Sequence, residues 1–199
     1  MNNVFWNDRY TGAVHVYGEA PNAFLAEVAP QIPAGPVLCL AEGEGRNAVH
    51  LATLGHRATA MDQSAVGLAK ARRLAGKRGV KIETVVADLA DYSIAAGTWA
   101  GIVAIFAHLP PALRRQVHRA VVAGLQPGGV YVLEAYTPAQ LAFDTGGPKS
   151  PELLMTLAGL REELSGLELL IARELEREVI EGTGHTGRGA VVQILARRP

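Results

Sequence analysis

The sequence predicts an α/β fold with a seven-stranded, mostly parallel sheet, one antiparallel strand and helices on both faces. Three observations support this fold class. Short β-rich runs alternate with longer helical patterns, which is typical of a parallel sheet. A glycine-rich turn at 42–47 lies between the first of these runs and the helix that follows it. Two strand-like runs end the chain without a helical pattern between them, and they are expected to pair as an antiparallel hairpin.

The first expected strand is the compact apolar run 36–40, and the first core helix spans 47–54, with Gly55 at its end. Ser64 is a good N-cap for a second core helix that runs toward Gly79. The remaining strands are expected at 57–61, 81–86, 102–106, 130–135, 167–179 and 190–196. Further helices are expected at 112–125 and 152–163.

No repeat, linker or low-complexity tract divides the chain, so residues 1–199 are expected to form a single domain. Within it, 1–30 is expected to form an N-terminal helical cover and 36–135 the cofactor-binding core. Residues 136–199 are then the substrate-side segment and the terminal hairpin.

Composition restricts the class of protein. The 199 residues are 49% hydrophobic and 19% charged, which is the globular range. Because 19 basic residues balance 19 acidic ones, a nucleic-acid partner is not expected. No signal peptide or membrane-spanning run is visible, and the single Cys39, expected to be a buried thiol, can form no internal disulfide. We expect a cytoplasmic protein, monomeric or weakly dimeric, that acts on a small molecule.

The turn Glu42-Gly43-Glu44-Gly45-Arg46-Asn47 is the first candidate binding element. Glycine permits backbone angles closed to other residues and lets a ligand approach the main chain. The helix N-terminus that follows supplies free N–H groups and partial positive charge. Such a turn suits the pyrophosphate of a dinucleotide or the methionine end of S-adenosylmethionine, and Gly43, Gly45 and Ala48 also match the dinucleotide fingerprint G-x-G-x-x-A.

Two acids end the next two strands. Asp62 can accept hydrogen bonds from both ribose hydroxyls of either cofactor, or it can be a simple acid at a helix N-terminus. Asp88 would lie near the adenine amino group, or else it is a turn acid. Their neighbours Gln63 and Leu89 complete this set of cofactor-binding candidates. Little chain remains after the fifth strand for the substrate half of a dehydrogenase, which favours S-adenosylmethionine.

At these residues the chain resembles the class I S-adenosylmethionine-dependent methyltransferases over essentially its whole length. The segments WAGIVAIFAHLPP and LQPGGVYVLEAY resemble the regions of their fourth and fifth strands. FWNDRY and GEGRNAVHLA are similar to the small tellurite-resistance and thiopurine methyltransferase-like proteins. The resemblance implies a Rossmann-like fold and S-adenosylmethionine as cofactor, with S-adenosylhomocysteine as product. It also implies a small acceptor such as a thiol, selenium or tellurium compound.

The resemblance adds an N-terminal block to the site, in which Trp6, Arg9, Tyr10 and Tyr17 are candidates for covering cofactor and substrate. The chain also departs from the family pattern. Cys39 and Ala41 stand where an acid and a glycine are usual, so Glu42 is expected to pair with the methionine ammonium instead. An acid is also absent at Ala100 and no N-P-P-Y-like motif follows, which disfavours a nucleic-acid amino-methyltransferase.

Two residues are candidates for chemistry. His108 follows the fourth strand, at the edge where open α/β sheets bind ligands, and an ordinary histidine pKa would let it take a proton. The alternative is a structural hinge before Pro110 and Pro111. Tyr136 ends the fifth strand as a catalytic hydroxyl or a pocket wall.

Other polar residues are expected to have simpler roles. Arg46 and Asn47 shape the turn. His185 and Arg188 lie in the glycine-rich hairpin loop, which could overhang the pocket, and they are interpreted as mobile solvent residues rather than pocket residues. Three further histidines are interpreted as surface or packing residues: His50, His56 and His118. No group has metal-ligand spacing, so no metal is expected.

Two alternative functions remain open at this point. An NAD(P)-binding oxidoreductase has a similar architecture. A non-catalytic regulator would bind S-adenosylmethionine without turnover.

Overall fold

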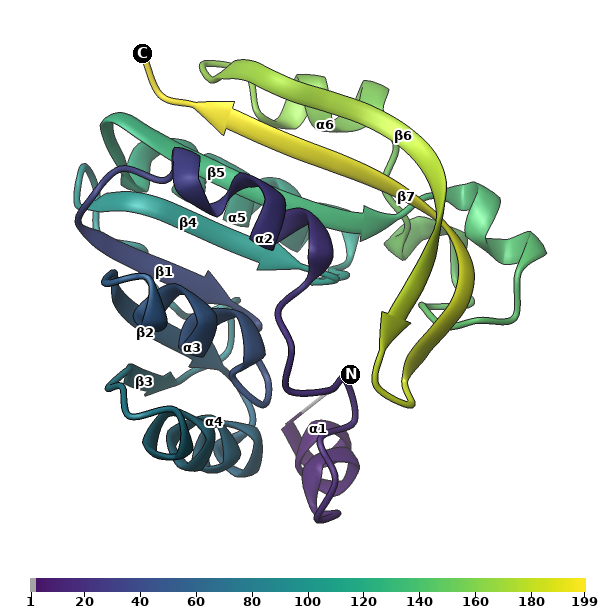
Figure 1. Ribbon diagram of the computed structural model, residues 1–199. Coiled ribbons are helices and arrows are strands. Elements are labelled where there is room, and N and C mark those ends of the chain that lie inside the picture. Colours follow the sequence, from purple (N-terminus) through teal and green to yellow (C-terminus); the bar gives the residue numbers. More distant parts are fainter. Residues whose placement is uncertain (1–2) are drawn as a thin grey trace.

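The structure, a computed structural model, describes residues 3–199, which form a seven-stranded sheet with helices on both faces (Figure 1). The strand order is β3-β2-β1-β4-β5-β7-β6. The strands are β1 (Pro36–Leu40), β2 (Arg57–Asp62), β3 (Glu83–Val86), β4 (Trp99–Ile105), β5 (Leu125–Tyr136), β6 (Glu168–Glu181) and β7 (His185–Arg197).

Neighbouring strands from β3 to β5 are parallel, whereas β7 is antiparallel to both β5 and β6. The predicted fold class, including the single antiparallel strand, is therefore confirmed. Because the parallel strands all end at one edge, the segments that follow β1, β2, β3, β4 and β5 meet there.

The helices are α1 (Asn3–Tyr10), α2 (Ala23–Val28), α3 (Arg46–Thr53), α4 (Ala65–Lys77), α5 (Pro111–Gly124) and α6 (Leu157–Glu163). Short 3₁₀ turns lie at Ala29–Gln31, Pro138–Ala142 and Pro151–Leu153. Within residues 3–199, no helix has the length and apolar character needed to cross a bilayer. The expected N-terminal cover at 1–30 contains α1 and α2, and its first two residues lie outside the described part.

Alternate side chains of the strands feed two hydrophobic cores. Val37 and Cys39 of β1 pack with Leu51 of α3 on one face, together with α2. Leu38 and Leu40 point to the opposite face, into the core that includes α5 and α6. This two-residue alternation is why a short apolar strand can hold helices on both sides. Cys39 is fully buried, as predicted for its thiol.

Several element boundaries differ from the prediction, and β4, for example, begins at Trp99 rather than at 102. The helix expected at 112–125 ends at Gly124, and β5 begins at Leu125 rather than at 130. The Pro-Gly-Gly sequence lies inside this strand, beside a register shift in the β4–β5 pairing, so it bends the strand instead of preceding it. The helix expected at 152–163 begins only at Leu157, because the Thr156 hydroxyl accepts the Gly159 N–H and caps it there.

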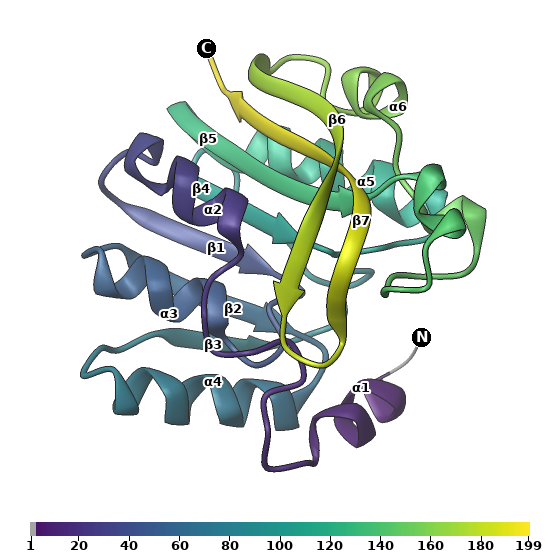
Figure 2. The same cartoon turned by 45° about the vertical axis from the view of Figure 1, so that its right-hand side comes forward.

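The terminal hairpin is longer than predicted, and its glycine-rich part is a strand rather than a loop. β7 begins at His185, and only 182–184 turn between the strands. At Gly189 of β7 the strand packs tightly, since a Cβ there would lie 3.1 Å from the Gln140 side-chain oxygen and 3.2 Å from the Tyr136 ring. The hairpin curves away from the sheet toward α1 (Figures 1 and 2).

A buried polar network holds the curved hairpin in place. Glu134 of β5 is fully buried and accepts hydrogen bonds from Asn22, Arg177 and Gln193. Arg177 of β6 also binds Glu181, at 2.9 Å. Asn22 donates to both glutamates, at 2.8 Å each. A buried charge is tolerated only when it is paired and hydrogen-bonded, and this network meets that condition.

Removing one partner of this network should be costly. We expect Arg177→Met to lower the free energy of unfolding by about 3 kcal/mol, because it leaves buried carboxylates without their counter-charge. The matched control is Arg197→Met, which breaks the solvent-exposed pair with Glu168 on the same hairpin and should cost less than about 1 kcal/mol. Denaturant unfolding measures both values, and equal losses would contradict a special role for the buried network.

Candidate active site

The glycine turn follows β1 with a tightly constrained backbone. Gly43 and Gly45 have φ values of +61° and +92°, and Ala41 has a φ of +49° although it is not a glycine. A Cβ atom on Gly43 would lie 2.7 Å from the Tyr10 hydroxyl, and one on Gly45 would lie 2.4 Å from the Ala71 Cβ. The turn therefore requires glycine both for its conformation and for the close approach of its neighbours.

Glu42 caps the helix that the turn introduces. One of its carboxylate oxygens accepts the N–H groups of Asn47 and Ala48, at 2.8 Å each. The N-cap residue itself is Gly45, which has no side chain to accept the free N–H groups at the start of α3. Burial raises the pKa of Glu42 to about 7, while these two bonds oppose the shift. Its pairing with a methionine ammonium stays a prediction.

Asp62 joins the turn to the end of β2. It is 6% exposed, and its two oxygens accept the N–H groups of Gly43 at 2.8 Å and Ser64 at 2.7 Å. Burial raises its pKa, and the amide bonds lower it. Asp62 thus lies directly against the glycine turn, with Gln63 beside it, and its contact with a ribose stays a prediction.

Asp88 lies farther along the same edge, just after β3. Its side chain is exposed and accepts the Ala90 N–H at 2.9 Å, so it also stabilises a turn. Leu89 packs into the core on the α5 side. The structure therefore brings the turn, Asp62 and Asp88 to successive positions along one sheet edge, and their contacts with a cofactor stay predictions.

The N-terminal block covers this edge. Tyr10 is buried between Gly43 and Gly67, with its ring stacked on Trp6 at 5.7 Å. Arg9 donates to the Tyr17 hydroxyl at 3.0 Å. All four predicted aromatic and basic residues of the block therefore lie together beside the turn.

Three residues that fasten the cover were missed from the sequence. Asn7 accepts the Ser64 hydroxyl at 2.7 Å, where α4 begins. Lys70 pairs with Glu44 at 2.5 Å and also donates to the Gly12 and Val14 carbonyls. No sequence signal distinguishes these residues, because each pair joins segments more than 20 residues apart.

His108 is held by backbone groups at both ring nitrogens. Its Nδ1–H donates to the Leu153 carbonyl at 2.9 Å, and its Nε2 accepts the Tyr136 N–H at 3.3 Å. This pattern requires the neutral ring, and burial lowers its pKa to about 4. Neither nitrogen is free to take a proton from a substrate. The contacts favour the structural alternative for His108, and its catalytic role stays a prediction.

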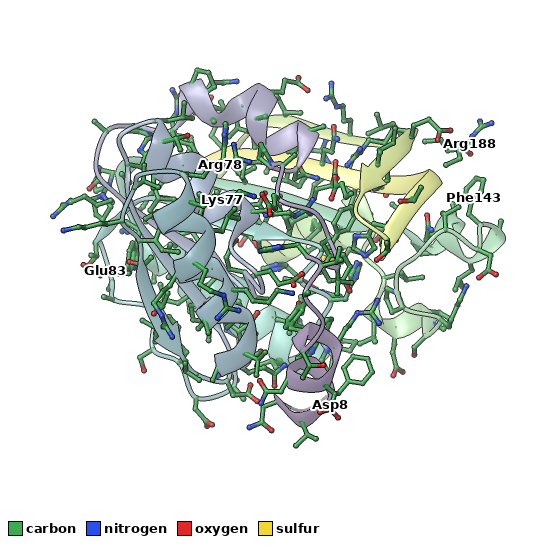
Figure 3. All side chains as sticks on the ribbon, turned by 60° about the horizontal axis from the view of Figure 1, so that its bottom comes forward. Asp8, Lys77, Arg78, Glu83, Phe143 and Arg188 are labelled. Carbon is green, nitrogen blue, oxygen red and sulfur yellow. The ribbon has the colours of Figure 1, made fainter. Side chains whose placement is uncertain are left out.

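Four rings gather beyond the ends of β4 and β5. His185 lies 4.6 Å from Tyr17, 4.6 Å from Phe106 and 5.4 Å from Tyr136, measured between ring centroids. Only 8% of His185 is exposed, so its interpretation as a solvent residue is wrong. The curvature of the hairpin buries it, and sequence spacing does not report that curvature. Arg188 is exposed as expected and points outward at the periphery (Figure 3), where it pairs with Glu176.

Arg46 links the hairpin to the glycine turn. One amino group of its guanidinium, Nη2, binds Glu181 at 2.5 Å, while the other, Nη1, is buried and has no hydrogen-bond partner within residues 3–199. Asn47 accepts the Asn22 N–H at 3.0 Å. Arg46 therefore does more than shape the turn, because beside the turn it places a buried N–H group, at Nη1, that has no partner within residues 3–199.

Comparison with known proteins identifies the domain that this edge belongs to. A family model described as a methyltransferase domain matches residues 37–129, a range that includes the glycine turn, Asp62 and Asp88. This range, just under half of the chain, is similar to a methyltransferase domain. The predicted resemblance to this class is therefore confirmed.

One curated relative and two solved structures are also similar to this chain. The 2-heptyl-1-hydroxyquinolin-4(1H)-one methyltransferase of Mycobacteroides abscessus is 30% identical over 125 residues, 60% of this chain and only 55% of its own length. A structure solved for the conversion of a disulfide into a thioacetal in echinomycin biosynthesis has a TM-score of 0.79 at 21% identity, covering 99% of this chain and 89% of the other. TehB from Haemophilus influenzae has a TM-score of 0.70 at 21% identity, covering 99% and 67%. These two structural likenesses establish the fold of the methyltransferase domain.

The neutral state of His108 predicts a pH dependence of stability. Its folded pKa of about 4 lies below the ordinary 6.5, so the unfolded chain binds the proton first as the pH falls. The stabilisation is complete above pH 6.5 and is lost as the pH falls toward 4. His108→Asn keeps a donor for the Leu153 carbonyl but has no group that takes up a proton in this range. The slope of its unfolding free energy against pH should therefore be smaller than that of the unmodified protein, by the equivalent of about one proton. Urea unfolding at a series of pH values measures it, and an unchanged slope would show that His108 is already accessible to protons.

Proposed function

We propose that the chain transfers a methyl group from S-adenosylmethionine to a small-molecule acceptor. The observation that carries this proposal is the glycine turn followed by Asp62 and Asp88 along one sheet edge, inside a methyltransferase domain. The same match favours this activity over the oxidoreductase alternative.

The residues at this edge fit the cofactor. In the proposed arrangement the turn and Glu42 hold its methionine end, Asp62 and Gln63 its ribose, and Asp88 and Leu89 its adenine. The unpaired Nη1 of Arg46 provides an independent test of fit, because a buried guanidinium beside the turn suits the methionine carboxylate. Trp6, Arg9 and Tyr17 cover the site.

The bound cofactor supplies an activated methyl group on a sulfonium. The chain therefore has to position the acceptor in line with that bond and to exclude water. The buried network and the Lys70–Glu44 pair serve this purpose, since they hold the hairpin and the N-terminal block over the edge.

The acceptor is proposed to be a compound that ionises or is already a soft nucleophile. Thiol, selenium and tellurium compounds meet this condition without a protein base. The hydroxyquinolone named for the Mycobacteroides abscessus relative adds an aromatic hydroxyl to the candidates. His108 offers no free nitrogen to either kind of acceptor.

The cofactor assignment can be tested at Asp62. We expect Asp62→Ala to weaken S-adenosylhomocysteine binding by about tenfold or more, because charge-assisted bonds to ribose contribute about 1.5–3 kcal/mol. Asp144→Ala, which removes a solvent-exposed acid, is the matched control and should bind normally. Calorimetry on folded variants measures both affinities, and equal values would contradict the assignment of Asp62 to the ribose.

Turnover is a separate question from binding. The purified chain with methyl-labelled cofactor and an acceptor panel should produce labelled product and S-adenosylhomocysteine in equal amounts. Tight cofactor binding with no transfer to any acceptor would support the regulator instead.

The cover makes a further prediction. Bound S-adenosylhomocysteine should slow amide hydrogen exchange in 3–18 and in the hairpin turn 182–184, because the ligand adds contacts beneath both. Exchange in α6, on the opposite face, serves as the internal control. If exchange in the N-terminal block is the same with and without the ligand, the block only packs against the core and does not cover the ligand.

A further inference from the structure

Two buried polar atoms on adjacent rings of the cluster lack partners. Within residues 3–199, Tyr136 Oη and His185 Nδ1 are buried and make no hydrogen bond. Their rings are perpendicular and 5.4 Å apart, and the residues are 0% and 8% exposed. An unsatisfied buried polar group costs about 1–3 kcal/mol, so two of them on adjacent rings need an explanation.

The surrounding backbone is adapted to this pair. Gly146 passes directly over it, since a Cβ there would lie 2.9 Å from His185 Cδ2 and 3.3 Å from Tyr136 Oη. Phe106 has a φ of +54° and stacks on Tyr136 with a centroid distance of 4.6 Å. A positive φ in an aromatic residue stores strain, and such strain gathers at ligand sites.

We propose that Tyr136 Oη and His185 Nδ1 bind the nucleophilic oxygen or sulfur of the acceptor, which enters as an anion and is methylated without a protein base. The inference rests on the proposed function. The acceptor loses its proton to solvent before it binds. Its electron pair then forms the bond to the methyl carbon, and the bond from that carbon to the sulfonium breaks. Its electrons stay on sulfur, leaving a neutral methylated acceptor and S-adenosylhomocysteine.

The charges around His185 keep it from acting as a base. It is faced by Arg9 of α1, Arg46 of α3, His108 beyond β4 and Arg177 of β6. Burial, followed by these groups, lowers the pKa of His185 to about 3. The ring is therefore neutral near pH 7 and can donate one N–H.

Tyr136 likewise keeps its proton. Burial raises its pKa, and Glu181 and Glu134 raise it further, while Arg177 acts in the opposite direction. Tyr17, the other hydroxyl of the cluster, also has a raised pKa because of burial. The pair thus offers two neutral donors to an incoming anion, and hydrogen bonds to an ionised acceptor are the strong kind.

The balance of charge favours an anion. Glu134 and Glu181 are matched by Arg177 and Arg46, so these four cancel. Arg9 remains, bound to the Tyr17 hydroxyl rather than to a carboxylate. A nearby positive charge and two donors stabilise the ionised form of a bound acid and lower its pKa. The site would therefore select acceptors by acidity.

A coloured acid tests this directly. Para-nitrophenol absorbs visible light only as its anion, so absorbance reports its ionisation when it is bound to protein saturated with S-adenosylhomocysteine. We expect the pKa of bound nitrophenol to fall by about one unit or more. An unchanged or raised pKa, or failure of the probe to bind, overturns the inference.

Variants assign the effect to the two donors. Tyr136→Phe and His185→Phe keep the rings and remove the polar atoms. Each should weaken binding of the nitrophenol anion about tenfold and leave S-adenosylhomocysteine affinity unchanged. His56→Phe, at a histidine outside the cluster, should change neither.

The two readouts separate the two proposals. If the unmodified protein does not bind S-adenosylhomocysteine, the proposed function is contradicted. Normal binding of that product together with unaltered nitrophenol binding in both variants would overturn only the acceptor site.

Discussion

The structure depends on the charge balance around Glu134. This fully buried carboxylate lies near the C-terminal end of β5, and Arg177 joins it to Glu181 near the hairpin turn. Glu181 in turn holds Arg46 at the start of α3. Because desolvating these groups offsets most of their attraction, the network fixes where the hairpin lies more than it adds stability. That position determines whether His185 is buried or exposed.

Buried polar contacts also explain how the N-terminal block is held in place. Lys70 is almost completely buried and satisfies its three donors with Glu44 and the carbonyls of Gly12 and Val14. The block is therefore tied to α4 and to the glycine turn by a few polar contacts instead of a broad apolar face. Such contacts open locally at lower cost than a core does, which suits a cover over an edge that small molecules must enter.

The sheet was predictable from the sequence because each strand carries its own local pattern. The apolar run at 36–40, the glycine turn and the acid at Asp62 needed only neighbours in sequence to be recognised. The hairpin was recognised but not its curvature, so His185 was misplaced. Residues such as Asn7 and Glu44 gain their roles from partners far along the chain, and single-sequence spacing carries no signal for them.

The histidines show why chemistry is harder to predict than fold. From the sequence, His108 is the natural base, because it follows a strand at the ligand-binding edge. Two backbone partners and burial keep it neutral and occupied. His185, which the sequence places in a loop, lies in the ring cluster and has a buried nitrogen without a partner in the described residues 3–199. A site built from neutral donors and surrounding arginines binds a charge instead of creating one, and it therefore leaves deprotonation to the acidity of the acceptor itself.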